Sequence, residues 1–213
     1  SIIPKRGFYE CTNLQSIQFS IPNPVFERSA FEGCSNLNFD IQLPTIKNEN
    51  FDEEYLYTVH KYAFARCSSL EGTNGQLHIP FYVNLIDDYA FQGCAFTHLE
   101  FDLDRSYTKT VTIIGEDDNE KDIEVSVPNE LTIGTGAFSG CNKLEYEVNL
   151  PDLTGNRIPD RLLQGCSRIQ SIDYPDSIHT IGKYAFSGCS GVRGALEIKP
   201  NVKRIEEYAF ADC

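Results

Sequence analysis

The sequence predicts a repeat solenoid built mostly from β-strands and loops. Three observations predict it: a Phe-x-x-Cys motif that occurs eight times, once with Leu in place of Phe; a motif spacing that centres on about 23 residues; and an alternating apolar segment after each motif. A repeat of this length corresponds to one coil of a solenoid. Because a single coil cannot bury its apolar face alone, stability must come from stacking each coil on the next.

The motif supplies the predicted core. All eight cysteines belong to it, one per copy, and successive cysteines are 23, 33, 27, 47, 25, 23 and 24 residues apart. The three longest intervals indicate insertions into the base repeat. We expect each Phe and each Cys to lie over its equivalent in the next coil. The predicted structural core of the repeat comprises Phe31, Cys34, Phe64, Cys67, Phe91, Cys94, Phe138, Cys141, Phe186 and Cys189.

Each motif is followed by a short alternating run that often ends in proline, as in residues 37–44, 144–151 and 169–175. A period of two predicts a strand whose apolar residues face inward. Two further apolar residues, three apart, precede the next motif, for example Val83 and Ile86. Each coil is therefore predicted to contain a strand, a proline turn, a second short extended piece, and a tight turn that carries the motif.

The full repeat, Cys-x-x-Leu-x-x-Ile-x-Ile-Pro-x-x-Val-x-x-Ile-x-x-Tyr-Ala-Phe, resembles the BspA-like leucine-rich repeat family of bacterial and protozoan surface proteins. The resemblance covers nearly the whole chain outside the insertions. It implies a right-handed leucine-rich-repeat superhelix with one short parallel β-strand in each coil. It also implies a module of a secreted or surface-anchored protein, often an adhesin that binds host or matrix proteins.

We expect one domain over residues 1–213, with about eight coils, the last truncated, and insertions near residues 45–55 and 102–130. The second insertion holds two runs rich in β-branched residues, 107–114 and 123–128, around a polar segment, which predicts a β-hairpin. Because a two-stranded ribbon is marginal alone, we expect it to lie against the solenoid flank or another molecule. Neither end resembles a polar cap, so we expect the native protein to continue further, with any secretion signal and anchor outside this fragment.

The phase of the cysteines argues against a disulfide framework. Every Cys follows a core residue by three positions, so all eight should occupy one buried column as free thiols. A disulfide between adjacent coils stays open as an alternative, because stacked residues lie close enough for one. Zinc is disfavoured because no Cys-x-x-Cys occurs.

Charge and motif content exclude several functions. The net charge is −13, from 31 acidic and 18 basic residues, so the surface would repel nucleic acid, and we expect no direct membrane insertion of this fragment. The four histidines form no metal-binding pair, and the hairpin tip, residues 117–122, lacks the glycine and ligand spacing of a calcium loop. We therefore expect no enzymatic activity, no cofactor and no metal site.

In a leucine-rich repeat the strands line the concave side, so the resemblance also indicates a partner-binding surface. The side chains expected to point outward from this face are polar, become acidic toward the C-terminal half and include few aromatic residues. The candidate partner-binding residues are Gln18, Gln42, His78, Glu100, Asn149, Asp173 and Glu197. The preceding outward positions add Ser16, Asp40, Gln76, His98, Glu147, Ser171 and Ala195.

Together these features predict a non-catalytic protein-binding module that is extracellular or on the cell surface. Its expected partners are host, extracellular-matrix or neighbouring-cell proteins, bound along the concave face, with the hairpin as an additional edge. A structural spacer or stalk within a larger surface protein is the alternative. Glycan binding ranks lower because Trp, the best stacking platform, is absent.

Overall fold

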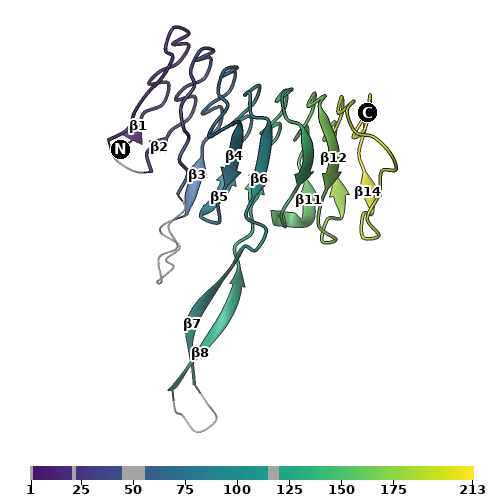
Figure 1. The fold of residues 1–213 in the computed structure, drawn as a ribbon. Coiled ribbons are helices and arrows are strands. Elements are labelled where there is room, and N and C mark those ends of the chain that lie inside the picture. The colour runs from purple at the N-terminus through teal and green to yellow at the C-terminus, as the bar shows by residue number, and fades with distance from the viewer. Residues whose placement is uncertain (1, 21–22, 45–55, 115–119) are drawn as a thin grey trace.

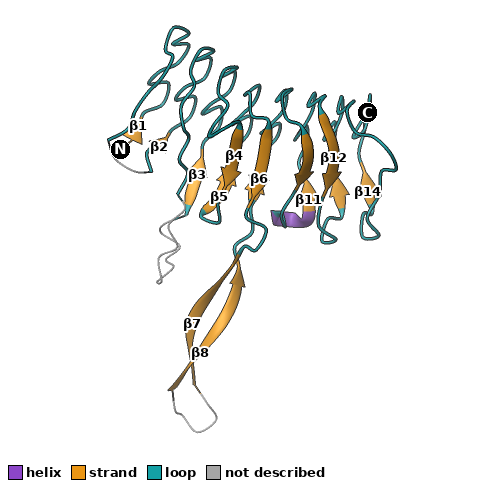
Figure 2. Ribbon diagram, in the orientation of Figure 1, coloured by secondary structure: helices purple, strands orange, loops and turns teal. Residues whose placement is uncertain are grey.

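A computed structural model describes residues 2–20, 23–44, 56–114 and 120–213. The chain forms a solenoid whose coils stack in sequence order from the N-terminus to the C-terminus (Figure 1). Short strands and turns make up nearly all of it, and the described residues contain one short 3₁₀-helix, η2 (Thr154–Asn156) (Figure 2). The predicted repeat solenoid is confirmed. The insertion predicted near residues 45–55 lies outside the described residues.

One side of the solenoid, which we call the strand face, carries the longer strands. These strands pair in parallel with the equivalent strand of a neighbouring coil, β4 with β6 and β10 with β12. Equivalent segments of the other coils, residues 15–19, 38–43 and 195–198, belong to the same face. The strands are β4 (Gln76–Ile79), β6 (His98–Phe101), β10 (Tyr146–Asn149) and β12 (Ile169–Asp173).

A second side, the anchor side, consists of shorter parallel strands that contain the paired apolar residues before each motif. They form the ladders β1-β2, β3-β5-β9 and β11-β13-β14. Their bounds are β1 (Ile2–Ile3), β2 (Val25–Phe26), β3 (Tyr57–Val59), β5 (Val83–Ile86), β9 (Thr132–Ile133), β11 (Arg157–Ile158), β13 (Thr180–Ile181) and β14 (Arg204–Ile205).

The strand predicted over residues 37–44 does not form. The expected inward residues Leu37, Ile41 and Leu43 are buried, so the alternation itself is correct. In the described part of the chain, however, a single main-chain hydrogen bond, from the Asn38 N–H to the Gln15 carbonyl at 2.9 Å, joins this segment to a neighbouring coil, and a strand requires a ladder of such bonds as well as a period. The first coil and residues 195–198 likewise lack a strand on this face.

The turn side carries the Phe-x-x-Cys motifs and joins the coils by main-chain hydrogen bonds. The N–H of the motif Phe donates to the carbonyl of the residue before the next motif, as from Phe31 to Ala63 and from Phe64 to Ala90, both at 2.8 Å. The motif rings stack in parallel, with centroids 5.4 Å apart for Phe64 and Phe91 and 5.6 Å for Phe91 and Phe138. The predicted vertical alignment of the motif is confirmed.

The turn also requires an unusual backbone. The residue two positions before each motif Phe or Leu has a φ of 56–60°, and in four coils this residue is a tyrosine. A left-handed conformation costs a residue other than glycine about 1–3 kcal/mol. Contacts between coils offset this cost: the N–H of Tyr62 donates to the Asp88 carbonyl at 3.1 Å, and the Tyr62 and Tyr89 rings stack at 5.4 Å.

The cysteines form a column of free thiols. Each thiol from Cys34 onward donates to the carbonyl of the motif Phe or Leu in the preceding coil, for example from Cys67 to Phe31 at 3.0 Å. The six central cysteines are buried, but Cys11 and Cys213 are exposed. The expectation that all eight are buried is therefore wrong for the two outer ones, because each has a motif coil on one side only.

The largest insertion forms the predicted hairpin, β7 (Ser106–Ile114) paired antiparallel with β8 (Glu120–Pro128). The second strand begins three residues earlier than the sequence pattern indicates. Residues 117–119 of the predicted tip lie outside the described residues. The insertion leaves the ladder intact, since β5 pairs directly with β9 on its far side, Ile86 opposite Ile133.

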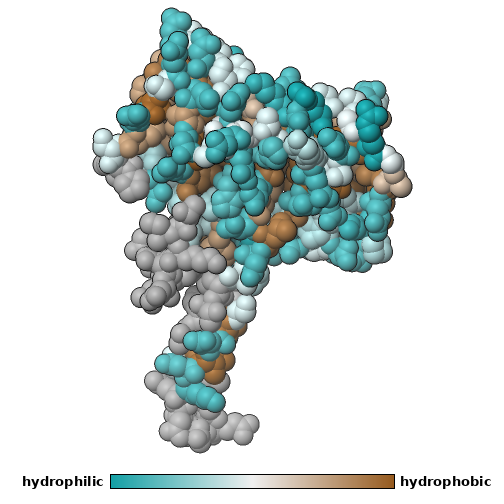
Figure 3. All heavy atoms as spheres, viewed as in Figure 1, coloured by the Kyte–Doolittle hydropathy of each residue, from teal (hydrophilic) through white to brown (hydrophobic). Residues whose placement is uncertain are grey.

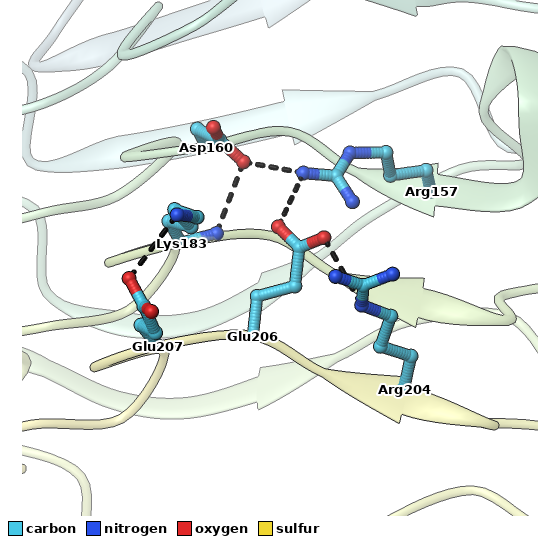
Figure 4. Close-up of polar contacts among 6 residues, drawn as sticks. All are labelled: Arg157, Asp160, Lys183, Arg204, Glu206 and Glu207. Atoms are coloured by element: carbon cyan, nitrogen blue, oxygen red, sulfur yellow. Dashed lines mark hydrogen bonds and ion pairs between the residues drawn. The ribbon is translucent and has the colours of Figure 1, made fainter.

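A charged cluster joins the last three coils at the end of the anchor side (Figure 4). The Glu206 carboxylate, whose side chain is 12% exposed, accepts a hydrogen bond from Arg157 at 2.8 Å and forms an ion pair with Arg204 at 3.3 Å. Arg157 also donates to Asp160, which accepts a second bond from the Lys183 main chain at 3.0 Å. The hydrogen bond from Arg157 lowers the pKa of Glu206.

Replacing a stacked ring should destabilise the solenoid. We expect Phe91→Ala to reduce the free energy of unfolding by about 3–5 kcal/mol, because it opens a cavity in the ring column. Phe91→Leu should cost about 1 kcal/mol, since Leu163 already occupies the equivalent position in another coil. Urea denaturation followed by circular dichroism measures both, and equal losses from the two variants would contradict the proposed role of the column.

The charged cluster should give the stability a dependence on pH. A carboxyl group whose pKa is lowered by folding stabilises the fold above its unfolded pKa, and this contribution disappears as the pH falls through the folded value. Glu206→Gln should therefore lower the free energy of unfolding at pH 7 by up to about 1 kcal/mol and have less effect below about pH 4.

Glu207→Gln is the matched control, because Glu207 is 71% exposed and pairs only with Lys183. This control should leave the urea midpoint unchanged at both pH values. A Glu206→Gln variant that loses as much stability at pH 3 as at pH 7 would exclude ionisation of Glu206 as the cause.

Candidate functional site

The structure brings the sequence-predicted candidates together on the strand face. The register places His78 opposite Glu100, and Asn149 opposite Asp173. All seven candidates are exposed, including Gln18, Gln42 and Glu197, which lie on segments without a regular strand. Parallel pairing carries equivalent side chains into rows across neighbouring coils. The outward polar positions thus share one face, and the pairs β4-β6 and β10-β12 hold part of it in register.

Polar contacts organise the central part of this surface. The Gln76 amide donates to the Glu100 carboxylate, and His78 Nε2 lies 2.9 Å from Asp102 Oδ1. The other oxygen of Asp102 accepts the Phe81 N–H at 2.8 Å. The sequence pattern did not select Asp102, because this residue follows its strand and falls outside the repeating outward positions. It belongs to the site because its backbone is held beside the end of β4.

The alternating pattern of the strand predicts the wrong orientation for Tyr146, an aromatic residue on this face. Tyr146 occupies an alternation position expected to face inward, yet it is 52% exposed and stacks on His98 with ring centroids 5.0 Å apart. The register shifts between Tyr146 and Glu147, and the φ of Tyr146 is 62°. This bulge turns the ring outward. The strand face therefore has an exposed aromatic platform.

Two adjoining hollows open over the N-terminal half of the face. One has a volume of about 590 Å³ and is polar, with Asp40, Gln76 and Glu100 in its lining. The other has a volume of about 580 Å³, and Phe19 and Phe39 lie in its lining. Gln18, Gln42, His78 and Glu100 among the predicted residues line these hollows, whereas Asn149, Asp173 and Glu197 do not.

The charge of the face is uneven. Asp173 forms an ion pair with Lys199 at 3.0 Å, and Glu145, at the edge of the face, pairs with Arg168 at 2.5 Å. Among the described residues, no basic side chain pairs with Asp40 or Glu100. Hydrophilic residues cover much of the solenoid in the view of Figure 3, with apolar patches between them.

The hairpin extends away from the solenoid (Figure 1). Of the two arrangements expected from the sequence, packing against the solenoid flank is therefore not the one observed, and contact with another molecule stays a prediction. Its strands leave apolar side chains exposed, with Ile114 at 72%, Val125 at 38% and Val111 at 37%. Main-chain pairing holds the ribbon from Ser106 opposite Pro128 to Ile114 opposite Glu120, and the Thr112 hydroxyl also donates to the Asp122 carboxylate at 2.7 Å.

A buried arginine attaches the hairpin to the solenoid. The Arg105 guanidinium donates to the carbonyls of Phe81 at 2.8 Å, Pro80 at 3.2 Å, Asn129 at 3.2 Å and Val83. Burial lowers the pKa of Arg105 to about 10, so the group remains charged at neutral pH. No sequence pattern indicated this residue, because its partners are carbonyl groups some 22 to 25 positions away.

The buried centre of the cysteine column disfavours the thiolate form. Burial raises the pKa of Cys141 to about 12 and the pKa values of Cys94 and Cys166 well above the usual range. The thiolate is the nucleophilic form, so these sulfurs remain protonated and unreactive. In the described part of the chain, no group of three His, Cys, Asp or Glu side chains is arranged to hold a metal ion.

No helix among the described residues has the length and apolar character needed to cross a membrane.

Two solved structures are similar to this chain. A leucine-rich repeat protein from Bacteroides ovatus ATCC 8483 is 24% identical, with a TM-score of 0.48, over 88% of this chain and 44% of its own. A leucine rich cell surface protein from Faecalibacterium prausnitzii A2-165 is 19% identical, with a TM-score of 0.41, over 97% of this chain and 59% of its own. The chain spans about half the length of these proteins. No curated protein matches it.

The model of the BspA type leucine rich repeat region matches this sequence in six copies, over residues 1–54, 45–117 and 118–213. These ranges take in the whole chain and include every Phe-x-x-Cys turn, the strand face and the hairpin. The chain therefore belongs to the BspA type leucine-rich repeat family.

Proposed function

We propose that this chain is a non-catalytic protein-binding module of a secreted or cell-surface protein, which adheres to host, matrix or neighbouring-cell proteins through its strand face. The observation that carries the proposal is the set of exposed polar side chains held in register on that face, His78 beside Glu100 and Asn149 beside Asp173. Family membership supports a protein-interaction role.

The electrostatics favour a basic partner. The chain has a net charge of −13, and the unpaired carboxylates of the face concentrate negative potential where a partner would approach. Charge complementarity of this kind increases association rates and selects partners more than it increases affinity. Several copies arrayed on a surface would add avidity to a weak single contact.

The hairpin provides an additional contact edge in this proposal. Its β7 and β8 strands project beyond the solenoid, and neither has a further strand partner in the described residues. An exposed two-stranded ribbon offers main-chain groups to a partner strand. The ribbon stands at the insertion between β6 and β9, so one ligand could contact both it and the strand face (Figure 1).

A charge-reversal variant tests the role of the strand face. We expect Glu100→Lys/Asp173→Lys/Glu197→Lys to weaken binding at least tenfold, in surface plasmon resonance against a panel of matrix proteins such as fibronectin and fibrinogen. Binding by the unmodified chain should weaken as salt rises from 0.05 to 0.5 M, because salt screens exposed charges.

The control variant Asp176→Lys/Glu207→Lys/Asp212→Lys changes the net charge equally at exposed sites away from the strand face. It should bind as the unmodified chain does. An equal loss of binding in both variants would show that the overall charge of the chain, and not the strand face, determines binding. Absence of binding by all proteins, even when arrayed at high density, would instead favour a structural spacer.

A further inference from the structure

The strand face has a gap between the second and third coils. β4 pairs with β6 on one side, but its other edge faces residues 39–43 of the preceding coil without forming a ladder. Residues 39–43 make no main-chain hydrogen bond to another main-chain group among the described residues. Main-chain N–H and C=O groups in folded proteins are nearly always paired. Among the described residues, the gap is thus flanked on one side by main-chain groups that have no main-chain partner, at residues 39–43, and on the other by the outer edge of β4, where Gln76 is bonded to Thr73.

An extra turn in the third coil separates these segments. The Thr73 N–H and C=O bond to Gln76, the first residue of β4, at 3.2 and 3.0 Å. The same turn contacts the preceding coil, since Thr73 donates to the Asp40 carboxylate and the Glu71 N–H donates to the Asn38 side chain at 3.2 Å. These bonds hold the turn between the coils at one end of the strands. In the described part of the chain, no main-chain hydrogen bond runs between residues 39–43 and β4.

The polar hollow lies in this gap. It is lined by residues 40–43 on one side and by Gln76 and His78 of β4 on the other. A residue in a sheet occupies about 3.3 Å along its strand, about 4.8 Å across and about 10 Å in depth, or roughly 160 Å³. At that size, the 590 Å³ hollow has room for roughly three to four residues of an added strand.

The lining favours a basic side chain in the hollow. Asp40 accepts hydrogen bonds from Thr73 and from Gln42 at 3.3 Å, and Glu100 accepts one from Gln76. All these donors are neutral, so neither carboxylate has a described cationic partner. A Lys or Arg side chain between them would supply the missing positive charge and form charge-assisted hydrogen bonds.

The neighbouring hollow favours an apolar side chain beside the basic one. It adjoins the first along the face, because Asp40 and Gln42 line both. Its lining includes the half-buried rings of Phe19 and Phe39, which meet edge to face at 6.0 Å. Burial of an aliphatic group against these rings would remove apolar surface from water.

We propose that this gap, which we call the open-ladder groove, binds an extended peptide segment of a partner protein as an added β-strand. The segment pairs its main chain with residues 39–43 and β4, places a Lys or Arg between Asp40 and Glu100, and places an apolar side chain over Phe19 and Phe39. The inference rests on the proposed protein-binding function and specifies its partner. Recognition by strand addition obtains affinity from main-chain bonds and specificity from side-chain pockets.

Three fluorescein-labelled peptides test the groove in anisotropy titrations with the whole chain. The probe is Ser-Val-Lys-Val-Lys-Val-Ser, the charge control replaces both lysines with Glu, and the pairing control carries N-methyl groups on the three valines. We expect measurable binding by the probe only, weakened at least tenfold in each control. Equal binding by the N-methylated peptide would overturn strand addition.

Two protein variants locate the binding site. Asp40→Asn/Glu100→Gln should weaken probe binding at least fivefold. Glu147→Gln/Asp173→Asn removes the same charge from the C-terminal half of the face and should leave probe binding unchanged. Equal effects of the two variants would overturn the assignment to the groove. Thermal denaturation confirms that both variants fold.

Hydrogen exchange distinguishes this inference from the proposed function. The probe should slow amide exchange at residues 39–43, because an added strand gives their N–H groups acceptors. If fibronectin or fibrinogen binds through the strand face but neither the probe nor that protein protects these amides, the proposed function stands and the groove inference fails. If the probe protects them while no protein on the panel binds, the groove inference stands without the adhesion proposal.

Discussion

The need to stack one coil on another governs this structure. A single coil is too thin to shield its apolar interior from water. On the turn side, the Phe-x-x-Cys motif joins neighbouring coils by three kinds of contact. The Phe rings stack, the Phe N–H groups bond to the next coil, and the cysteine thiols bond to the preceding one. The left-handed tyrosines show how strong this constraint is, since contacts between coils maintain a conformation that tyrosine alone disfavours.

Insertions are tolerated where they leave that stacking intact, and their effects differ. The hairpin is inserted between β6 and β9, yet on the anchor side β5 still pairs directly with β9. Arg105, at the base of the hairpin, donates hydrogen bonds to main-chain carbonyls of the solenoid. The short extra turn before β4 stays within the solenoid and lies between β4 and the extended segment 39–43. The long insertion thus adds an exposed element, whereas the short one lies beside the proposed groove.

The surface follows a different logic from the core. On the C-terminal half of the strand face, Asp173 forms an ion pair with Lys199, whereas the described hydrogen bonds to Asp40 and Glu100 on the N-terminal half come from neutral donors. The negative electrostatic potential is therefore stronger over the N-terminal half of the strand face, at Asp40 and Glu100, than around Asp173. We therefore expect a partner to bind at the open-ladder groove, where carboxylates, hollows and main-chain groups without a described main-chain partner lie together, in preference to the rest of the strand face.

The sequence by itself determined the solenoid, the core column, the outward rows and the hairpin. These features depend on short-range periodicity, which recurs in every repeat. Phe91, Cys141 and Asn149 therefore lie where their positions within the repeat predict. Only the tertiary structure decided the exposure of Tyr146, the contact of His78 with Asp102, the burial of Arg105 and the missing strand at residues 39–43. Each of these depends on a bulge or a partner from another coil. Periodicity specifies the direction of a side chain within a coil, but the neighbouring coil decides whether that segment acquires hydrogen-bond partners.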